Sequence, residues 1–437
     1  MREKILSTML IKLQLQHFDT HVNVTTDNGT QAPYNDLSPG MKEYYSPMLI
    51  ENAQPKLVHS KFLDKAPIPQ HEGDAVKFRK YAALPKVTDT LVEGVTPDGG
   101  TLDMSDITVA VDQYGYYVVV SDKLSMTHID DVLVRATELL GAQAGLTIDT
   151  IDRNALQAGT NVTFASKWSG DTETVVVSRS ELDKTAILKV DTLEQVTAKL
   201  KTWNAQPFED GYYRAVVHPY VVYDLRRDPD WLEARKYAQP EEIMSGEVGR
   251  IAGIRFFETS EAKIYAGKKL TAASRTLTVK TAVTNNTSVP VKELITADDV
   301  TAFAAREANE KKVYIAGTEY TVSALVAGAA GSASLTLSAA ASIAQNAVIA
   351  PKGGAGDGSA VFGTLVYGKN AAAVTEIEGG GLEFIAKPRG SSGVNDALNQ
   401  RASAGWKLSR ATKILTDDYI VRVESCSTRF SAIAEEN

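Results

Sequence analysis

The sequence predicts an α+β protein, and three observations lead to this fold class. Short β-rich stretches alternate with helical ones along most of the 437 residues. One helical stretch, Thr127–Leu156, is much longer than its neighbours, and the segment Gly267–Asp357 differs from them in composition. Strands interleaved with helices around one long helix indicate an α+β body, and the length allows roughly two to three units of about 150 residues each.

Residues 1–72 are predicted to form an N-terminal arm with short helices. The stretch 19–40 is polar and rich in turn signals, which favours an extended chain. Apolar residues then follow helical spacing over Met41–Phe62, but Pro47 and Pro55 would divide that helix into short pieces.

Residues 73–124 predict an extended β-arm. The strand candidate Val76–Tyr81 is matched by the alternating stretch Ile107–Asp112, so the two are expected to pair. About 25 residues lie between them, and a connection of that length without its own core is usually functional or disordered. An arm that reaches away from the body would explain this length.

Residues 125–190 contain the strongest predicted helix, Thr127–Leu156. Thr127 can cap its N-terminus, and the apolar residues recur at helical spacing, although Gly141 and Gly145 weaken the middle. At 1.5 Å per residue the helix would be about 45 Å long. We therefore interpret it as the spine of the body.

Residues 191–266 are predicted to form a core of helices and strands. The helix Asp191–Asn204 has a capping-box pair in Thr192 and Gln195. Its expected buried stripe consists of Leu193, Val196, Leu200 and Trp203. The elements expected next are a strand at Tyr213–Val217, a helical stretch around Tyr220–Tyr237 and a strand at Ile251–Glu258.

Residues 267–357 are predicted to be an inserted β-rich domain, because Ala, Thr, Ser and Val dominate them. Val313–Val322 contains a turn at Ala316–Gly317, which is a hairpin signal, and the glycine-rich run 352–358 is interpreted as a flexible exit. The uncharged stretch Tyr320–Ala350 would be long enough to cross a bilayer. Small and polar residues dilute it, so we expect β structure and no membrane span.

Residues 358–437 are predicted to supply the closing strands and the C-terminal segment. The strand candidates are Leu365–Tyr367, Ala372–Ile377, Trp406–Leu408 and Tyr419–Val423. With these strands the body resumes after the insertion.

The composition is ordinary for a soluble globular protein and shows no basic excess. Hydrophobic residues make up 43% and charged residues 23% of the chain. The net charge of -8 argues against a DNA-coating protein but does not exclude a shell that surrounds DNA. The single cysteine, Cys426, cannot form an internal disulfide, fits folding in a reducing cytoplasm and is interpreted as a small buried hydrophobe.

Two stretches approach chemical motifs but lack a required residue. Gly363–Asn370 nearly matches the phosphate-binding pattern G-x-x-x-x-G-K-[ST], but Asn370 replaces the hydroxyl residue that would hold magnesium, so a strand and its turn are expected. His71 and Glu72 begin a zinc-protease motif, but Ala75 replaces its second histidine. No catalytic, cofactor-binding or metal-binding residue is therefore expected. A surface or capping role is expected for each of the six histidines, His17, His21, His59, His71, His128 and His218.

Four stretches resemble one family of phage proteins. They are LSPGMKEYY at 37–45, LIENAQPKLVH at 49–59, GRIAGIRFFET at 249–259, and GWK at 405–407 followed by IL at 414–415. Together with the order of arm, β-arm, spine helix, helix-flanked sheet, insertion and closing strands, they resemble the N-four-like family of tailed-phage major capsid proteins, which has the Hong Kong 97-type fold. The resemblance covers about residues 37–265 and 360–430.

The resemblance implies a role for each part of the chain. It implies that 73–124 is the E-loop, that 125–190 belongs to the peripheral domain, and that 191–266 and 358–437 build the axial domain with part of the peripheral core. The insertion 267–357 departs from the family.

The implied function is that of a non-enzymatic major capsid protein. Such a subunit assembles with itself, in hexamers and pentamers, into an icosahedral shell that encloses double-stranded genomic DNA without sequence-specific binding. Portal, scaffold and decoration proteins are implied as further partners, with no membrane, the virion as location and the host cytoplasm as the place of assembly. The alternative is another virion component, such as a decoration or tail protein.

Overall fold

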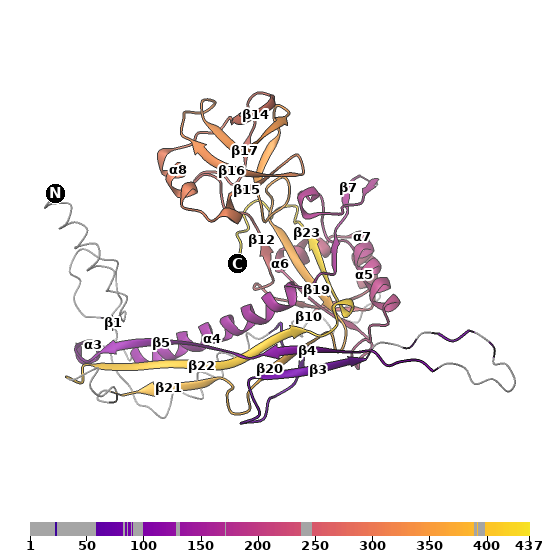
Figure 1. Ribbon diagram of the computed structural model, residues 1–437, viewed down its shortest axis with the longest axis vertical. Coiled ribbons are helices and arrows are strands. Elements are labelled where there is room, and N and C mark those ends of the chain that lie inside the picture. Colours follow the sequence, from indigo (N-terminus) through magenta and orange to yellow (C-terminus); the bar gives the residue numbers. More distant parts are fainter. Residues whose placement is uncertain are drawn as a thin grey trace. The chain divides into compact units, whose positions relative to one another are not determined.

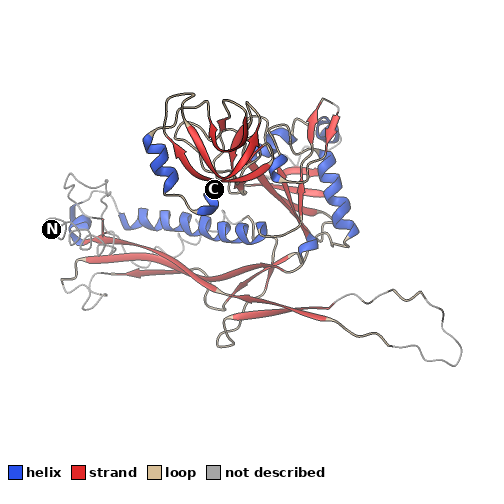
Figure 2. Ribbon diagram, turned by 45° about the horizontal axis from the view of Figure 1, so that its top comes forward, coloured by secondary structure: helices blue, strands red, loops and turns tan. Residues whose placement is uncertain are grey.

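The computed structural model describes residues 22–23, 58–81, 84, 86–88, 90, 99–127, 132–170, 172–236, 247–388, 391 and 398–437. The chain forms two compact units. Unit 1 comprises Met1–Leu57, Ala66–Asp149 and Val374–Ala411, and unit 2 comprises Val58–Lys65, Thr150–Ala373 and Thr412–Asn437. Helices and strands occur in both units, which confirms the α+β class (Figures 1 and 2). Most of the predicted N-terminal arm, including its helical stretch up to Leu57, lies outside the described residues.

In unit 1, a long helix packs against a sheet. The central strand is β22 (Arg401–Ile414), which pairs antiparallel with β5 (Asp112–Ser121) and β21 (Glu383–Lys387). The helix α4 (Val132–Gln157) buries Leu140, Ala144 and Ile148 against Ala404, Trp406 and Leu408 of β22. The Trp406 indole Nε1 donates a 2.9 Å hydrogen bond to the Gln143 Oε1 on the helix, which fixes the helix on the sheet.

The predicted spine helix is confirmed over Val132–Leu156, but its start differs from the expectation. Thr127 is the last residue of a separate short helix, α3 (Asp122–Thr127), and residues 128–131 lie outside the described part. Gly141 and Gly145 are both buried, so the absence of a side chain at these positions allows close packing of the helix.

The β-arm of unit 1 is a hairpin, as predicted. β3 (Ala75–Tyr81) pairs antiparallel with β4 (Met104–Ala110), and Phe78 lies opposite Ile107. The remaining strands with residues in unit 1 are β1 (Val22–Asn23), which pairs with β5, and β20 (Ala372–Glu376).

Unit 2 contains a sheet with the strand order β10-β11-β9-β19-β23-β6. These strands are β10 (Glu247–Ile251), β11 (Ile254–Glu258), β9 (Tyr213–Val217), β19 (Val361–Tyr367), β23 (Ile420–Ser425) and β6 (Val162–Phe164). The helices are α5 (Val190–Thr202), α6 (Pro219–Leu225) and α7 (Pro229–Lys236). Every residue of β9 and β19 is buried, because helices or other segments pack on both faces of these central strands. The smaller elements are β2 (Asp64–Lys65), β7 (Lys167–Ser169), β8 (Thr172–Thr174), β12 (Ile264–Tyr265) and the 3-10 turns at Arg179–Glu181 and Asp417–Tyr419.

The predicted start of α5 is wrong, because a residue distant in sequence caps this helix. Lys189 occupies the N-cap position and its side chain makes no capping bond. The Asp228 carboxylate instead accepts a 2.9 Å hydrogen bond from the Val190 backbone N–H. Thr192 is buried inside the helix, and Trp203 is 37% exposed beyond its end, so it does not extend the buried stripe.

Two further predicted elements are divided in the structure. The helical stretch Tyr220–Tyr237 forms α6 and α7, because Pro219 and Pro229 each begin a new helix. The strand Ile251–Glu258 is a hairpin, β10 and β11, whose two turn residues have positive φ (Ala252, +53°; Gly253, +77°).

The segment 267–357 contains its own sheet and its own core. The strand order is β13 (Leu277–Thr278), β18 (Val348–Pro351), β15 (Lys312–Ile315), β16 (Thr318–Val326), β17 (Ser334–Ile343) and β14 (Val283–Pro290). Helix α8 (Ala297–Ala304), which begins with a capping box of Thr296 and Asp299, buries Phe303 in this core, and the 3-10 turn Ala308–Lys311 precedes β15. The hairpin around Ala316–Gly317 and the β structure of Tyr320–Ala350 are confirmed. Among the described residues, no helix is long and apolar enough to cross a membrane.

The interpretation of the glycine run 352–358 as a flexible exit is wrong. Its backbone packs closely against other segments: a Cβ on Gly356 would lie 1.9 Å from the Ser180 carbonyl oxygen. The Gly356 N–H donates to the Leu182 carbonyl, and Gly358 has a φ of +81°. These glycines therefore permit close approach and left-handed backbone rather than mobility.

A buried ionic cluster joins three segments of unit 2. Glu424 on β23 is 1% exposed, and its carboxylate accepts hydrogen bonds from Arg179 Nε at 2.6 Å and Arg422 Nε at 2.9 Å. The Arg179 guanidinium also lies 3.8 Å from the centre of the Tyr265 ring. Two cations and an aromatic face thus compensate the burial of one carboxylate.

The ends of the insertion predict that it can be removed. β12 ends at Tyr265 and pairs antiparallel with β19, so residues 267–357 occupy the place of a hairpin turn. A Cβ on Gly353 would lie 3.3 Å from the Gly267 Cα, so the two ends almost touch. Replacing 268–352 by a short Gly/Ser linker should leave a soluble body with a cooperative thermal transition. An aggregated or unfolded product would contradict a separate domain.

The buried cluster predicts a large loss of stability for Glu424→Gln. This change removes the charge that compensates two arginines, and breaking a buried pair costs about 3–5 kcal/mol. The free energy of unfolding, measured with urea at neutral pH, should fall by that amount. The control Glu209→Gln, on a side chain that is 94% exposed, should change it by less than about 0.5 kcal/mol. Similar stabilities for both variants would contradict the assigned role of Glu424.

Candidate functional site

The candidate site is the surface of the β-arm in unit 1, because it exposes apolar side chains without a partner in the described structure. Along the hairpin, Val76, Phe78, Ile107 and Val109 share one face. The middle of the opposite face carries the charged and polar residues Lys77, Arg79, Asp106 and Thr108. Val109 is buried and the other three residues are half-buried, so this apolar face is covered best near the base of the arm.

Exposure increases toward the tip of the arm. Val87 is 86% exposed and Leu102 is 70% exposed. Tyr81, Leu84 and Met104 are also more than half exposed. Each Å² of apolar surface that stays exposed to water forgoes about 25 cal/mol of free energy that burial would provide. Contiguous exposed apolar patches therefore mark interaction sites. The described residues that lead to the tip therefore have the properties of a binding surface.

The residues considered for chemistry do not come together in a reactive site. Gly363–Tyr367 lies in the fully buried strand β19 and Asn370 follows it in a turn with a φ of +59°, which confirms the expected strand and turn. A Cβ on Gly363 would lie 2.9 Å from the Gln157 side chain, so there is no space for a phosphate beside this backbone. Among the described residues, no three His, Cys, Asp or Glu side chains are placed to hold a metal ion.

The cysteine and the described histidines have structural roles. Cys426 is fully buried, and burial raises the pKa of its thiol, which confirms the interpretation as a hydrophobe. His71 is exposed in a turn, and His218 caps a helix, as expected. His59 is 1% exposed, so the expected surface role is wrong for this residue. His17, His21 and His128 lie outside the described residues.

His218 is buried in a neutral form. Its Nδ1 accepts a 3.1 Å hydrogen bond from the Tyr220 N–H at the start of α6. The rings of Tyr220 and Phe362 lie 4.7 and 5.0 Å away, and burial lowers the pKa of the imidazole to about 4. Protonation of Nδ1 would remove this acceptor and break the cap.

Among solved structures, the chain is similar to capsids of several phages, whereas no family model and no curated protein matches its sequence. It is similar to the capsid of Ralstonia phage GP4, with 12% identity and a TM-score of 0.49 over 94% of this chain and 98% of that one. For the capsid of cyanophage Pam1, the identity is 13% and the TM-score 0.49, over 93% and 99% of the chains. For the capsid of Helicobacter pylori phage KHP30, they are 10% and 0.49, over 83% and 87%. At this level of similarity, the likenesses by themselves assign neither a family nor a function to the chain.

His218 predicts a stability loss in mild acid. Because its pKa is about 6.5 in the unfolded chain and about 4 in the fold, the unfolded state binds more protons between these values. The free energy of unfolding should therefore fall as the pH drops from 6.5 to 4, by roughly 1.4 kcal/mol per pKa unit. His218→Asn keeps a capping acceptor and should lose this part of the pH dependence. Parallel pH profiles for the two proteins in urea unfolding would contradict the assignment.

Proposed function

We propose that this protein is the major capsid protein of a tailed phage, which assembles into the icosahedral shell around double-stranded DNA. The observation that carries this proposal is the β-arm with its exposed apolar tip. A lone two-stranded hairpin is marginally stable in water, and one thin arm cannot bury this many apolar side chains on itself. A neighbouring copy in a closed lattice supplies the missing surface.

The order of elements supports the same function. It matches the order implied by the Hong Kong 97-type fold: β-arm, spine helix, helix-flanked sheet and closing strands. In this proposal, 73–124 is the E-loop, 125–190 belongs to the peripheral domain, and 191–266 with 358–437 builds the axial domain. The insertion 267–357 is an additional domain of this chain.

The mechanism of a shell protein is association with copies of itself. Hexamers and pentamers need heterologous contacts, in which unlike surfaces of neighbouring copies meet. Each stable contact buries on the order of 1,200 Å² or more, and many such contacts add through multivalency. Portal, scaffold and decoration proteins are the further partners in this proposal.

The proposed role is structural and not enzymatic. In this role the protein belongs to the virion and assembles in the host cytoplasm. Its net charge of -8 supports enclosure of DNA without sequence-specific binding. Electron microscopy of the protein expressed alone tests the proposal: closed shells or shell fragments would support it. Tubes would indicate a tail protein, and a dispersed monomer that binds preformed capsids would indicate a decoration protein.

A variant with a shortened arm tests whether the arm is needed for assembly or for folding. Tyr81 lies directly opposite Met104, so replacing 82–103 by Asn-Gly would close the hairpin with a tight turn. Ordering the long arm costs about 1–2 kcal/mol of backbone entropy per residue, and only contacts with a neighbour offset this cost. The short-arm protein should keep its cooperative thermal transition and fail to form closed particles. Normal shells would contradict a role of the arm in assembly, and an unfolded product would show that the arm is part of the body.

A further inference from the structure

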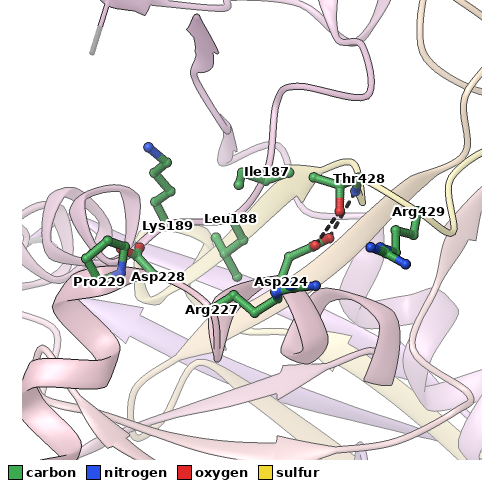
Figure 3. A pocket seen from close by; sticks show the side chains of 9 residues that line it. All are labelled: Ile187, Leu188, Lys189, Asp224, Arg227, Asp228, Pro229, Thr428 and Arg429. Carbon is green, nitrogen blue, oxygen red and sulfur yellow. Dashed lines mark hydrogen bonds between the residues drawn. The ribbon is translucent and has the colours of Figure 1, made fainter. Parts of the chain in front are cut away.

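A surface groove in unit 2 has an apolar floor and a basic rim. It has a volume of about 490 Å³, and Ile187, Leu188 and Pro229 contribute its apolar lining. Lys189, Arg227 and Arg429 contribute its cations (Figure 3). Nine residues line the groove. They come from the start of α5, from α6 and α7, and from the segment after β23.

The two carboxylates of the groove leave its three cations with one positive charge in excess, and hydrogen bonds inside the fold hold both carboxylates in place. Asp224 accepts hydrogen bonds from the N–H and hydroxyl of Thr428, at 3.0 and 2.6 Å (Figure 3). It also accepts one from the Ser427 hydroxyl at 2.6 Å. Asp228 caps α5 through the Val190 N–H and accepts from the Asp230 N–H at 3.3 Å. The N-terminus of α7 is thus already occupied by a carboxylate.

The rim cations keep their charge available to a partner. The Arg227 guanidinium donates to the Tyr223 hydroxyl, which is neutral. The Lys189 ammonium lies 3.6 Å from the centre of the Trp168 ring. Arg429 makes no ion pair with any residue that the structure describes. An acidic group at the rim would therefore gain charge-assisted hydrogen bonds without displacing an existing salt bridge.

An extended segment close to this groove has the complementary character. Along Glu173–Val177, Glu173 is exposed, Val175 is 72% exposed and Val177 is 74% exposed. Val176 between them is buried in the core, which holds the segment in place. Alternate residues of an extended chain lie on one side, so Glu173, Val175 and Val177 present one carboxylate and two valines together.

We propose that the segment Glu173–Val177 of one copy docks into the groove of a second copy of this chain. The valines then cover the apolar floor at Ile187 and Pro229, and the Glu173 carboxylate meets the basic rim. The groove carries three cations against two carboxylates, and no ion pair of Glu173 is found among the described residues. The inference deepens the proposed shell function by naming one of its contacts.

The two surfaces lie close together on unit 2. Glu173 lies directly opposite Trp168 in the β7–β8 pair, and Trp168 contacts Lys189 at the groove rim. The docking segment and the groove are therefore neighbours on one side of unit 2. Each copy of the chain therefore carries both surfaces that the contact needs.

Charge reversal at the two surfaces tests the docking. Glu173→Lys and Arg429→Glu each place like charges together in the contact, whereas the double variant restores an opposite pair. Subunit association in sedimentation and the yield of closed particles in electron microscopy should each fall at least tenfold for either single variant. Both should recover in the double variant. Thermal unfolding of each variant checks the fold, and Glu209→Lys, at an exposed acid of unit 2, is the matched control.

The other outcomes identify different roles for the groove. If neither single variant weakens association, or if the double variant is no better than the single ones, the proposal is wrong. A groove that binds DNA would show duplex binding that Arg429→Glu abolishes, without a change in association, which would also overturn it. Because association is measured by sedimentation, a chain that associates through this contact but forms no shells would refute the shell function and leave the docking intact. Normal shells from all variants would refute the docking and leave the shell function intact.

Discussion

The buried Glu424 carboxylate connects several segments of unit 2. The carboxylate is almost fully buried, and a buried charge is tolerated only where opposite charges and hydrogen bonds compensate it. Arg179 comes from the segment before α5, Arg422 lies on the same strand, and Tyr265 ends β12 at the start of the insertion. These segments are far apart in sequence, so the charge is satisfied only when the sheet, the preceding loop and the base of the insertion have all assembled. Arg179 also reaches toward the Gly353 carbonyl at the other end of the insertion.

The elements that could be predicted from the sequence are those whose signal is local. The pairing of Val76–Tyr81 with a second strand, the long helix through Leu140 and Ile148, and the hairpin at Ala316–Gly317 all follow from side-chain spacing or turn residues close to one another. The cap of α5 could not be predicted, because Asp228 lies 38 residues from Val190 and meets it only in the folded unit. The glycine run 352–358 was misread for the same reason, since its close neighbours, such as Ser180, belong to a distant segment.

The two candidate sites also differ in whether the sequence signal for them is local. The apolar tip of the β-arm could be predicted, because Leu84, Val87 and Leu102 lie in a long connection with no core of its own. The groove could not, because Lys189, Arg227 and Arg429 are ordinary surface cations in the sequence and become a cluster only through the packing of α5, α6 and the segment after β23. The two acidic residues of the groove, Asp224 and Asp228, serve the fold itself, because their oxygens accept hydrogen bonds from the backbone and from hydroxyl groups.

The insertion occupies the position of a turn between the paired strands β12 and β19. At such a position the connecting segment can vary in length and content. β12 and β19 pair in register, and Gly267 and Gly353 lie side by side at the two ends of the insertion. The entropy of closing a loop grows only slowly with its length, so a domain with adjacent termini adds little strain there. The same position could carry a foreign domain, and each chain would then hold one copy of that domain.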